Sequence, residues 1–546
     1  MNDGSHTASL RTPSHQPPAL TAPLPAIATI TGTVARHRQP PRLRLYRPPW
    51  LLGLILTAQA VLSLRLIPAT GAYGDEGLYL WAGHLEWAHW LHGTPTPDFG
   101  AYFSGAPAFY PPLGALADSI GGLAGARLLS LALILGATLL LHRVTGRLFG
   151  PMAALCAVMM FAGAGATQFL AAFATYDALA IFLLAAATCL AVEASLCRHF
   201  AARAALVVAS AAALAGADAA KYVAILFDPV VIAIATAAFW RGRRSLPTGI
   251  MAGAALTAVF ATIAGLAFAA APMSYLTGIT FTTLSRQHGA FPMRDILLVA
   301  AGWSGIIVLL AITGLVPVIA ASRPGTRALG IAFAAGPLLV PAAAAHAHLF
   351  TSMFKHLAYG EWFGAVPAGY ALASLIHAVP PVKTRAAARI TSIIGTGGAL
   401  VGAALAGNQY VNMGPDFRLA LPAVQAAAAH AAHPVIASDD VDIAQYYAYH
   451  DIPGARILAI GPDPHWARAN PAQVPRYGRE SGLAAYRPAI RHGDLTAVVL
   501  SGFHLWGLPD KAVRADLAAS RCYRLAASIP YTKDKQRFDY QVWVRR

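Results

Sequence analysis

Two adjacent carboxylates, Asp75 and Glu76, follow the first long apolar segment of the chain, in the run Tyr-Gly-Asp-Glu-Gly at residues 73–77. Carboxylates at the edge of a bilayer are costly unless they are paired or take part in function. In such places they serve as proton sites, as ion sites, or as bases toward a bound hydroxyl. Asp75 and Glu76 are therefore the first candidate functional residues.

Asp177 is a second acidic candidate, at the start of the apolar segment 177–196. The order of the apolar segments places it on the same outer face as Asp75. A carboxylate in the first turn of a helix also suits the helix dipole, so Asp177 taken alone has two interpretations. Together with Asp75 it would enclose a polar cavity at lipid depth, which favours a functional site.

Composition defines the class of protein that must position these groups. The chain has 546 residues, of which 57% are hydrophobic and only 12% charged, and its mean hydropathy is +0.53. These values predict an α-helical polytopic membrane protein. The net charge of +16 does not indicate a nucleic-acid partner, because Lys and Arg fall in short clusters between apolar runs. The four cysteines show neither a disulfide framework nor a zinc-binding spacing.

Apolar segments long enough to cross a bilayer, about 20 residues each, recur along the chain. All five connections predicted to lie inside carry basic residues, as cytoplasmic loops do. About eleven spans then leave the N-terminus in the cytoplasm and the C-terminus outside an inner or plasma membrane. The candidate spans are 49–67, 123–142, 151–171, 177–196, 203–219, 222–240, 248–271, 296–320, 328–345, 358–378 and 389–407.

Three regions follow from these patterns. Residues 1–47 predict a disordered basic cytoplasmic arm, and residues 48–407 a transmembrane domain with a long first outer loop at 68–122. The middle of that loop, from Glu76 to Leu91, predicts a short helix in the membrane interface. Residues 408–546 predict a small extracytoplasmic α/β domain. Its strands are expected near 434–437, 455–460, 495–500 and 540–544, and its helices near 416–432, 442–449 and 510–520.

Several short motifs stand in a fixed order in the first half of the chain. They are GDE at 74–76, YPPL at 110–113, GARLLS at 125–130, HR at 142–143, LFG at 148–150, TYD at 175–177, Lys221 and Pro229. The ordered set resembles the amino-terminal half of the family 39-type glycosyltransferases. These polytopic enzymes of the C-type glycosyltransferase fold include protein O-mannosyltransferases and the aminoarabinose transferase of lipid A. The resemblance implies that fold and a glycosyltransferase activity.

The activity implied is inverting transfer of a sugar from a polyprenyl-phosphate donor to a cell-envelope acceptor (glycan, lipid or protein) on the outer face. Asp75 is then the general base toward the acceptor hydroxyl, and Glu76, on another helical face, has an orienting role at most. The leaving phosphate calls for cations, of which Lys221 is the leading candidate; lipid headgroups are the alternative partners for the later basic residues. The donor-binding candidates are Glu76, Tyr110, Asp177, Lys221, Arg286 and Lys355.

A divalent cation is a further implication of the resemblance, because some relatives hold one between the acidic motifs and the donor phosphate. Asp75 and Asp177 are the candidate ligands for Mg²⁺ or Mn²⁺. The acidic-basic pair that precedes Pro-Pro in the aminoarabinose transferases is Phe109-Tyr110 here. This departure removes one ligand and one phosphate contact, and it argues against aminoarabinose transfer to lipid A.

The alternative function is a lipid or glycolipid transporter or flippase, whose acidic residues are ion or proton sites. The two halves of the chain show no internal repeat, and the long outer loop with an exported domain favours a surface enzyme. Residues 439–442 resemble the Asp-x-Asp motif of nucleotide-sugar transferases, but such a cluster also suits a helix start, which is the interpretation preferred here. The expected partners are the bilayer, a polyprenyl-linked sugar and an envelope acceptor, with no nucleic acid.

Overall fold

The computed structural model describes residues 50–546 with gaps, and these residues belong to one compact unit, Pro49–Arg546. The predicted arm at 1–47 and most of the predicted span at 389–407 lie outside the described residues. The gaps are 285–287, 322, 351, 379–397, 399–401, 403–404, 406, 412–415, 462–463, 503–509 and 534–535.

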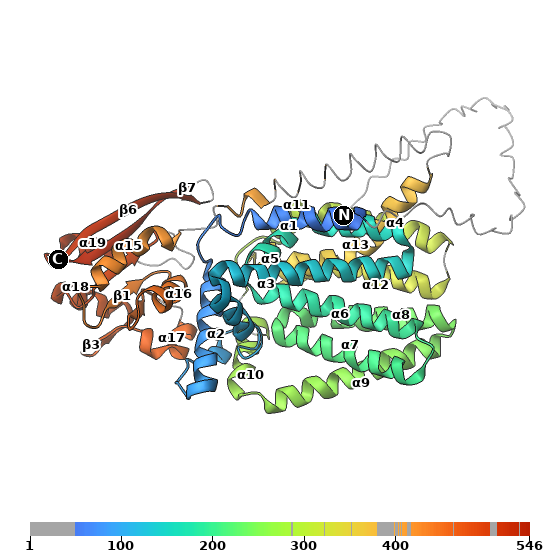
Figure 1. Cartoon of the computed structure of the whole chain (residues 1–546), viewed down its shortest axis with the longest axis horizontal. Coiled ribbons are helices and arrows are strands. Elements are labelled where there is room, and N and C mark those ends of the chain that lie inside the picture. Colours follow the sequence, from blue (N-terminus) through green and yellow to red (C-terminus); the bar gives the residue numbers. More distant parts are fainter. Residues whose placement is uncertain are drawn as a thin grey trace, which may run out of the picture. The chain divides into compact units, whose positions relative to one another are not determined.

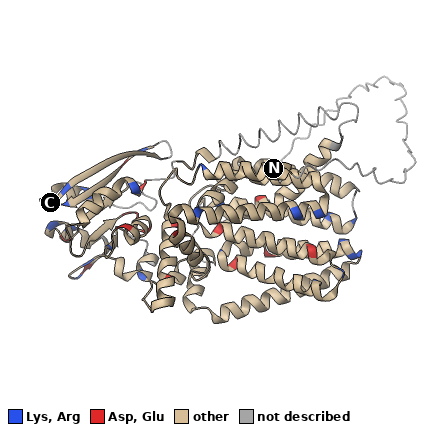
Figure 2. Cartoon of the chain, in the orientation of Figure 1, with Lys and Arg blue, Asp and Glu red and all other residues tan. Residues whose placement is uncertain are grey.

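The amino-terminal two thirds of the described chain are helical, and the long helices lie side by side (Figure 1). Figure 2 shows that most of the length of these helices carries few charged residues, as expected for segments in lipid. The helices are α1 Trp50–Leu64, α2 Gly74–His92, α3 Tyr110–Phe149, α4 Pro151–Ala162, α5 Gly165–Ala172, α6 Tyr176–Leu196, α7 Phe200–Ala220, α8 Asp228–Arg243, α9 Leu246–Ala270, α10 Met273–Ile279, α11 Met293–Ala321, α12 Pro324–Ala347 and α13 Met353–Ala378.

Seven helices of the described part are long and apolar enough to cross a membrane, and eight if the bent pair α4 and α5 forms one span. The chain is thus a multi-pass membrane protein, and its helical class is confirmed. Each of the first ten predicted spans coincides with a helix or a bent pair of helices. The total of eleven spans stays a prediction, because α1 and α13 are not among these seven or eight helices and the last segment lies largely outside the described residues.

Glycine and proline set the breaks between the helices. Pro151 opens α4 directly after Gly150, whose φ of 97° lies in the left-handed region that favours glycine. The pair α4 and α5 bends by 69° between Ala162 and Gly165. Within α3, Gly121 and Gly122 leave the helical conformation, so this helix is kinked.

The predicted span at 123–142 begins directly after the break at Gly121 and Gly122. The residues before this break, in the predicted outer loop, are also helical, since α3 starts at Tyr110. The physical reason is that Pro111 and Pro112 occupy the first helical turn, where proline is well tolerated because the N–H groups lack helical partners anyway. The helix predicted from Glu76 to Leu91 is present as α2, and its place in the membrane interface stays a prediction.

The carboxyl-terminal domain is built on a five-stranded sheet of order β2-β1-β5-β7-β6. Strands β1 Val435–Ser438, β2 Arg456–Ala459 and β5 Ala497–Leu500 are parallel, and β6 Tyr523–Lys533 and β7 Gln536–Arg545 add an antiparallel edge. Ile436 pairs with Ile457, and their side chains are buried. The helices of this domain are α15 Phe417–Ala428, α16 Val441–Asp451, α17 Pro464–Ala469, α18 Tyr486–His492 and α19 Asp510–Ala519, and a small hairpin joins β3 Arg476–Tyr477 to β4 Glu480–Ser481.

Helix α16 of this domain packs on α2. A Cβ atom at Gly77 of α2 would lie 2.8 Å from the carbonyl oxygen of Asp442, so glycine permits the close approach. The backbone N–H of Ala72 donates to the Tyr447 hydroxyl at 3.0 Å. Leu80 of α2 belongs to the same buried apolar cluster as Ile443 of α16. The α/β domain thereby contacts the helix that carries Asp75.

Candidate active site

Asp75 lies in the first turn of α2, at the end of the helix that meets the membrane bundle. The helix starts there because the carboxylate of Glu76 accepts a hydrogen bond from the backbone N–H of Tyr73 at 2.9 Å, which satisfies a donor at the helix N-terminus. The side chain of Asp75 is 31% exposed. Its carboxylate is therefore open to a ligand.

Glu76 points away from Asp75 and binds Arg127 of α3. The two side chains form paired contacts, Nε to Oε1 at 2.9 Å and Nη2 to Oε2 at 2.6 Å, and both are fully buried. The Ala174 backbone N–H also donates to Glu76 Oε1 at 2.7 Å. Since both carboxylate oxygens are engaged inside the protein, Glu76 fixes the start of α2 against α3 and against the turn before α6.

Arg127 in turn holds the backbone that leads into α2. Its guanidinium donates to the carbonyl oxygens of Ile67, Thr70 and Gly71 at 2.5, 3.0 and 2.7 Å. Its carbon Cζ lies 4.9 Å from the centre of the Phe173 ring. The GARLLS motif thus supplies the cation that orders the segment in front of Asp75.

Lys355 joins the two acidic candidates. Its ammonium Nζ lies 2.5 Å from Asp75 Oδ2 and 3.4 Å from Asp177 Oδ2. The lysine, in the first turn of α13, is 1% exposed, and the Asp177 side chain is fully buried. The structure therefore brings together Asp75, Asp177 and Lys355 from three helices that are far apart in sequence.

Asp177 has two further partners on α13. The Tyr359 hydroxyl donates to Asp177 Oδ1 at 3.0 Å, and His356 Nε2 lies 3.4 Å from the same oxygen. His356 and Tyr359 follow Lys355 by one and four residues, so the first two turns of α13 present all three groups to Asp177. Asp177 is held as a structural anchor, while Asp75 faces the open side.

Lys221 lies at the end of α7, beside the ring of Tyr176, the residue that precedes Asp177. Its ammonium donates to Ser104 Oγ at 2.6 Å and lies 5.3 Å from the centre of the Tyr176 ring. The Ser104 carbonyl accepts from the Tyr222 backbone N–H at 3.0 Å. A second cation therefore lies on the Tyr176 side of the site, fixed by the loop that follows α2.

Tyr110 and Arg286 are the remaining predicted site residues. Tyr110 is fully buried beside Tyr176, with the ring centres 5.5 Å apart, so it supports the wall of the site. Arg286 lies outside the described residues.

A divalent cation between Asp75 and Asp177 does not fit this arrangement. The Lys355 ammonium already stands between the two carboxylates, at the place where a bridging ion would bind. Its positive charge offsets the carboxylates that a metal would need as ligands. The arrangement therefore does not favour Mg²⁺ or Mn²⁺ at these two residues.

Sequence reasoning missed Tyr359 and set aside Asp442. The spacing of Lys355, His356 and Tyr359 at a helix start was the available signal for Tyr359. Helix α16 does begin at Val441, in keeping with the helix-start interpretation of residues 439–442. Yet Asp442 also lies near the site, because its carbonyl oxygen would be 2.8 Å from a Cβ atom at Gly77, two residues after Asp75. Burial, with smaller contributions from Asp440 and Asp75, raises the pKa of its carboxyl well above 3.8.

An apolar groove of about 460 Å³ opens between α5 and α11. A chain of aromatic rings leads from it to the site: Trp303 lies 6.2 Å from Tyr410, Tyr410 lies 5.2 Å from Phe169, and Phe169 lies 6.0 Å from Tyr73, next to Asp75 in sequence. The groove is lined by Gly165, Val299, Gly302, Trp303, Leu405 and Gln409.

Solved structures match this chain over most of its length. ArnT from Cupriavidus metallidurans, in a crystal structure bound to undecaprenyl phosphate, has a TM-score of 0.57 at 16% identity, covering 91% of this chain and 98% of ArnT. The apo oligosaccharyltransferase of Archaeoglobus fulgidus has a TM-score of 0.52 at 12% identity, covering 83% of this chain and 70% of that chain. AglB from the same organism, in complex with an inhibitory peptide and a dolichol-phosphate, has a TM-score of 0.50 at 13% identity, covering 83% and 69%.

At the level of sequence, no protein-family profile and no curated protein matches the chain. The structural matches nevertheless define the fold, which is that of the C-type glycosyltransferases. For the fold, the resemblance indicated by the ordered motifs is therefore confirmed.

Proposed function

We propose that this chain is a membrane glycosyltransferase that moves a sugar from a polyprenyl-phosphate donor to a hydroxyl of a cell-envelope acceptor, with Asp75 as the general base. The observation that carries the proposal is the contact of Lys355 with both Asp75 and Asp177 at 2.5 and 3.4 Å. It combines an open carboxylate with a buried cation in a fold shared with ArnT and AglB.

The donor class is supported by the chemistry of the site. The Lys355 ammonium lies 3.4 Å from Asp177, and the Lys221 ammonium lies 5.3 Å from the ring centre of the neighbouring Tyr176. A phosphate that gains charge as it leaves needs such cations. The apolar groove beside Trp303 suits an isoprenoid tail. The structural relatives ArnT and AglB were solved with undecaprenyl phosphate and a dolichol-phosphate.

In the proposed reaction the phosphate and Asp75 compete for Lys355. Without substrate, Lys355 neutralises Asp75 at 2.5 Å. When the donor phosphate binds, its negative charge draws the ammonium, and the Asp75 carboxylate becomes free to accept a proton. Arrival of the donor thus switches on the base.

The chemical step is a single displacement. The acceptor oxygen forms a bond to the anomeric carbon as the bond from that carbon to the phosphate oxygen breaks. The acceptor proton passes to Asp75, and the polyprenyl phosphate leaves beside Lys355 and Lys221. This route inverts the anomeric centre and needs only one exposed carboxylate. Asp177 does not supply a second one, because it is fully buried and accepts a hydrogen bond from Tyr359.

Orientation and acceptor follow from the same proposal. With the N-terminus in the cytoplasm, the start of α2 and the α/β domain face the outside of the inner or plasma membrane. The backbone of Asp442 in that domain approaches α2 at Gly77, two residues from Asp75. The α/β domain is therefore well placed to present the acceptor.

The test uses the full chain purified into lipid nanodiscs and a panel of radiolabelled undecaprenyl-phosphate sugars with cell-envelope extracts. We expect release of the lipid phosphate and transfer of the label, both reduced at least 100-fold by Asp75→Asn. Glu86→Gln, on the same helix α2, is the matched control and should retain activity.

Two results would contradict the proposal. Full activity of Asp75→Asn would show that Asp75 is not the general base, although the protein would still be a transferase. Movement of intact donor across vesicles, without turnover in the presence of any acceptor extract, would instead identify the alternative function of a lipid or glycolipid transporter.

A further inference from the structure

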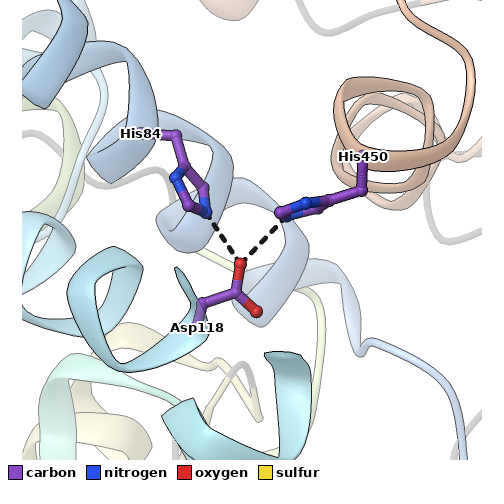
Figure 3. Close-up of side chains that lie close together, drawn as sticks. All are labelled: His84, Asp118 and His450. Atoms are coloured by element: carbon purple, nitrogen blue, oxygen red, sulfur yellow. Dashed lines mark hydrogen bonds and ion pairs between the residues drawn. The ribbon is translucent and has the colours of Figure 1, made fainter. Parts of the chain in front are cut away.

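A second cluster of ligand-type side chains lies further along α2, outside the site described above. His84 of α2, Asp118 of α3 and His450 of α16 place one ligand atom each within 4.8 Å of one another. His84 Nε2 lies 2.7 Å and His450 Nε2 2.9 Å from the same oxygen, Asp118 Oδ2 (Figure 3). Two imidazoles and one carboxylate from three separate helices thus converge on one point.

We propose that His84, Asp118 and His450 bind a zinc ion that fastens the α/β domain to the membrane domain. Two imidazole nitrogens and a carboxylate oxygen form the donor set that Zn²⁺ accepts, whereas Mg²⁺ and Ca²⁺ require oxygen ligands. The site does not depend on the transferase reaction, because none of its three residues contacts Asp75, Asp177 or Lys355 in the described part of the chain.

The surroundings of the cluster orient its ligands. The Tyr446 hydroxyl donates to Asp118 Oδ1 at 2.7 Å, which leaves Oδ2 directed at the two histidines. The His84 ring stacks on Tyr449 with ring centres 4.9 Å apart, and the His450 ring packs against Tyr446 at 4.9 Å. Such partners around metal ligands fix their rotamers and support affinity.

Burial and charge favour a bound cation. The Asp118 side chain is fully buried, and among the described residues its ion pairs are with these two imidazoles alone. A buried carboxylate without Lys or Arg gains from a divalent ion. The His450 side chain is 34% exposed, so an ion can approach from that side and a water can complete a tetrahedral set.

The geometry needs only a small adjustment. Tetrahedral ligands at about 2.1 Å from Zn²⁺ are about 3.4 Å apart. The present separations of 2.7 and 2.9 Å would therefore widen by about 0.7 and 0.5 Å. Because His450 is partly exposed on α16, its side chain can provide that movement.

The first measurement is the zinc content of the full chain, purified with a tag that contains no histidine, stripped with a chelator and returned to Zn²⁺. We expect one tightly held Zn²⁺ per chain by mass spectrometry of the metal. Co²⁺ in its place should give the visible absorption of a four-coordinate nitrogen and oxygen site. Absence of both signals from the unmodified protein would overturn the proposal and leave a cluster held by hydrogen bonds alone.

Variants place the ion. His450→Ala and Asp118→Asn should each weaken Zn²⁺ binding at least tenfold and abolish the rise in melting temperature that Zn²⁺ produces. His92→Ala, an exposed histidine on the same helix as His84, and His430→Ala, an exposed histidine of the α/β domain, are the controls. Equal binding by His450→Ala and His92→Ala would place any zinc elsewhere and contradict the proposal.

Discussion

Asp75 and Asp177 share the Lys355 ammonium but differ in the access of solvent to their carboxylates. The side chain of Asp75 is 31% exposed and that of Asp177 is fully buried. A general base must reach its substrate, whereas an anchor must hold its partners, so the two residues suit different roles. Lys355 connects the roles, because it is the group that a donor phosphate would attract away from Asp75.

Lys355→Met tests that connection. The substitution retains most of the side-chain volume but leaves Asp75 and Asp177 without their shared cation. We expect kcat/KM for the polyprenyl-phosphate donor to fall about 100- to 1,000-fold, the range for removal of one preorganised electrostatic group. Steady-state assays in nanodiscs measure this, with Lys511→Met, an exposed lysine of α19, as the control. A change no larger than that of the control would exclude Lys355 from the donor site.

Glu76→Gln separates an orienting role from substrate binding. The change leaves Arg127 buried without a counter-charge, and breaking a buried ion pair costs about 3–5 kcal/mol. We therefore expect a large drop in the melting temperature in detergent, by fluorescence-detected unfolding. A loss of activity with an unchanged melting temperature would instead indicate that Glu76 contacts the substrate directly.

At the scale of elements, α2 connects the two domains. Its first turn carries Asp75 and approaches α16 at Gly77, so a displacement of α16 would move the residues next to Asp75. The close approach is possible because residue 77 lacks a side chain. A movement of α16 changes the position of Asp75 only if the contact between α2 and α16 has little room to adjust.

Gly77→Ala tests the contact between α2 and α16. A Cβ atom there would meet the Asp442 carbonyl at 2.8 Å, and α16 must then shift. We expect a loss of about 1–3 kcal/mol, typical of overpacking, and faster hydrogen exchange in α16. Gly74→Ala is the matched control, because a Cβ at that position meets nothing within 4 Å. Equal exchange rates in the two variants would show that the helices are not tightly packed.

Asp442 gives this contact a pH dependence. Burial first, and then Asp440 and Asp75, raise the pKa of its carboxyl well above its ordinary value of 3.8. The folded protein therefore holds this proton more tightly than the unfolded chain, and the residue costs stability as pH rises from about 4 through the folded pKa. We expect Asp442→Asn to raise the melting temperature at pH 7 and the gain to shrink toward zero as the pH approaches 4. A gain that does not change with pH would contradict this origin.

At the scale of the whole molecule, long apolar periodicity predicted the helices well, and the strands β1, β2 and β5 follow from short apolar runs between turns. The edge strand β6 was missed because Pro530 and its exposed face give no such run. The pairing of Lys355 with Asp75 could not be predicted, since 280 residues separate them and only the packing of α13 on the bundle brings them together. His450 was missed for the same reason, because its partners lie on α2 and α3.

The orientation of the chain can be tested with its own cysteines. Cys522 lies in the α/β domain and Cys197 in the connection between α6 and α7, and both are partly exposed, whereas Cys156 and Cys189 are buried. With a cytoplasmic N-terminus and eleven spans, Cys522 is outside and Cys197 inside. A maleimide that does not cross membranes should then label intact spheroplasts at Cys522, and Cys197 should react only after permeabilisation. The variants Cys522→Ser and Cys197→Ser assign each signal.

Labelling of Cys197 in intact spheroplasts, with protection of Cys522, would reverse the orientation. The site with Asp75 would then lie on the cytoplasmic face. Nucleotide sugars, rather than outer-face lipid donors, would have to be considered as its substrates.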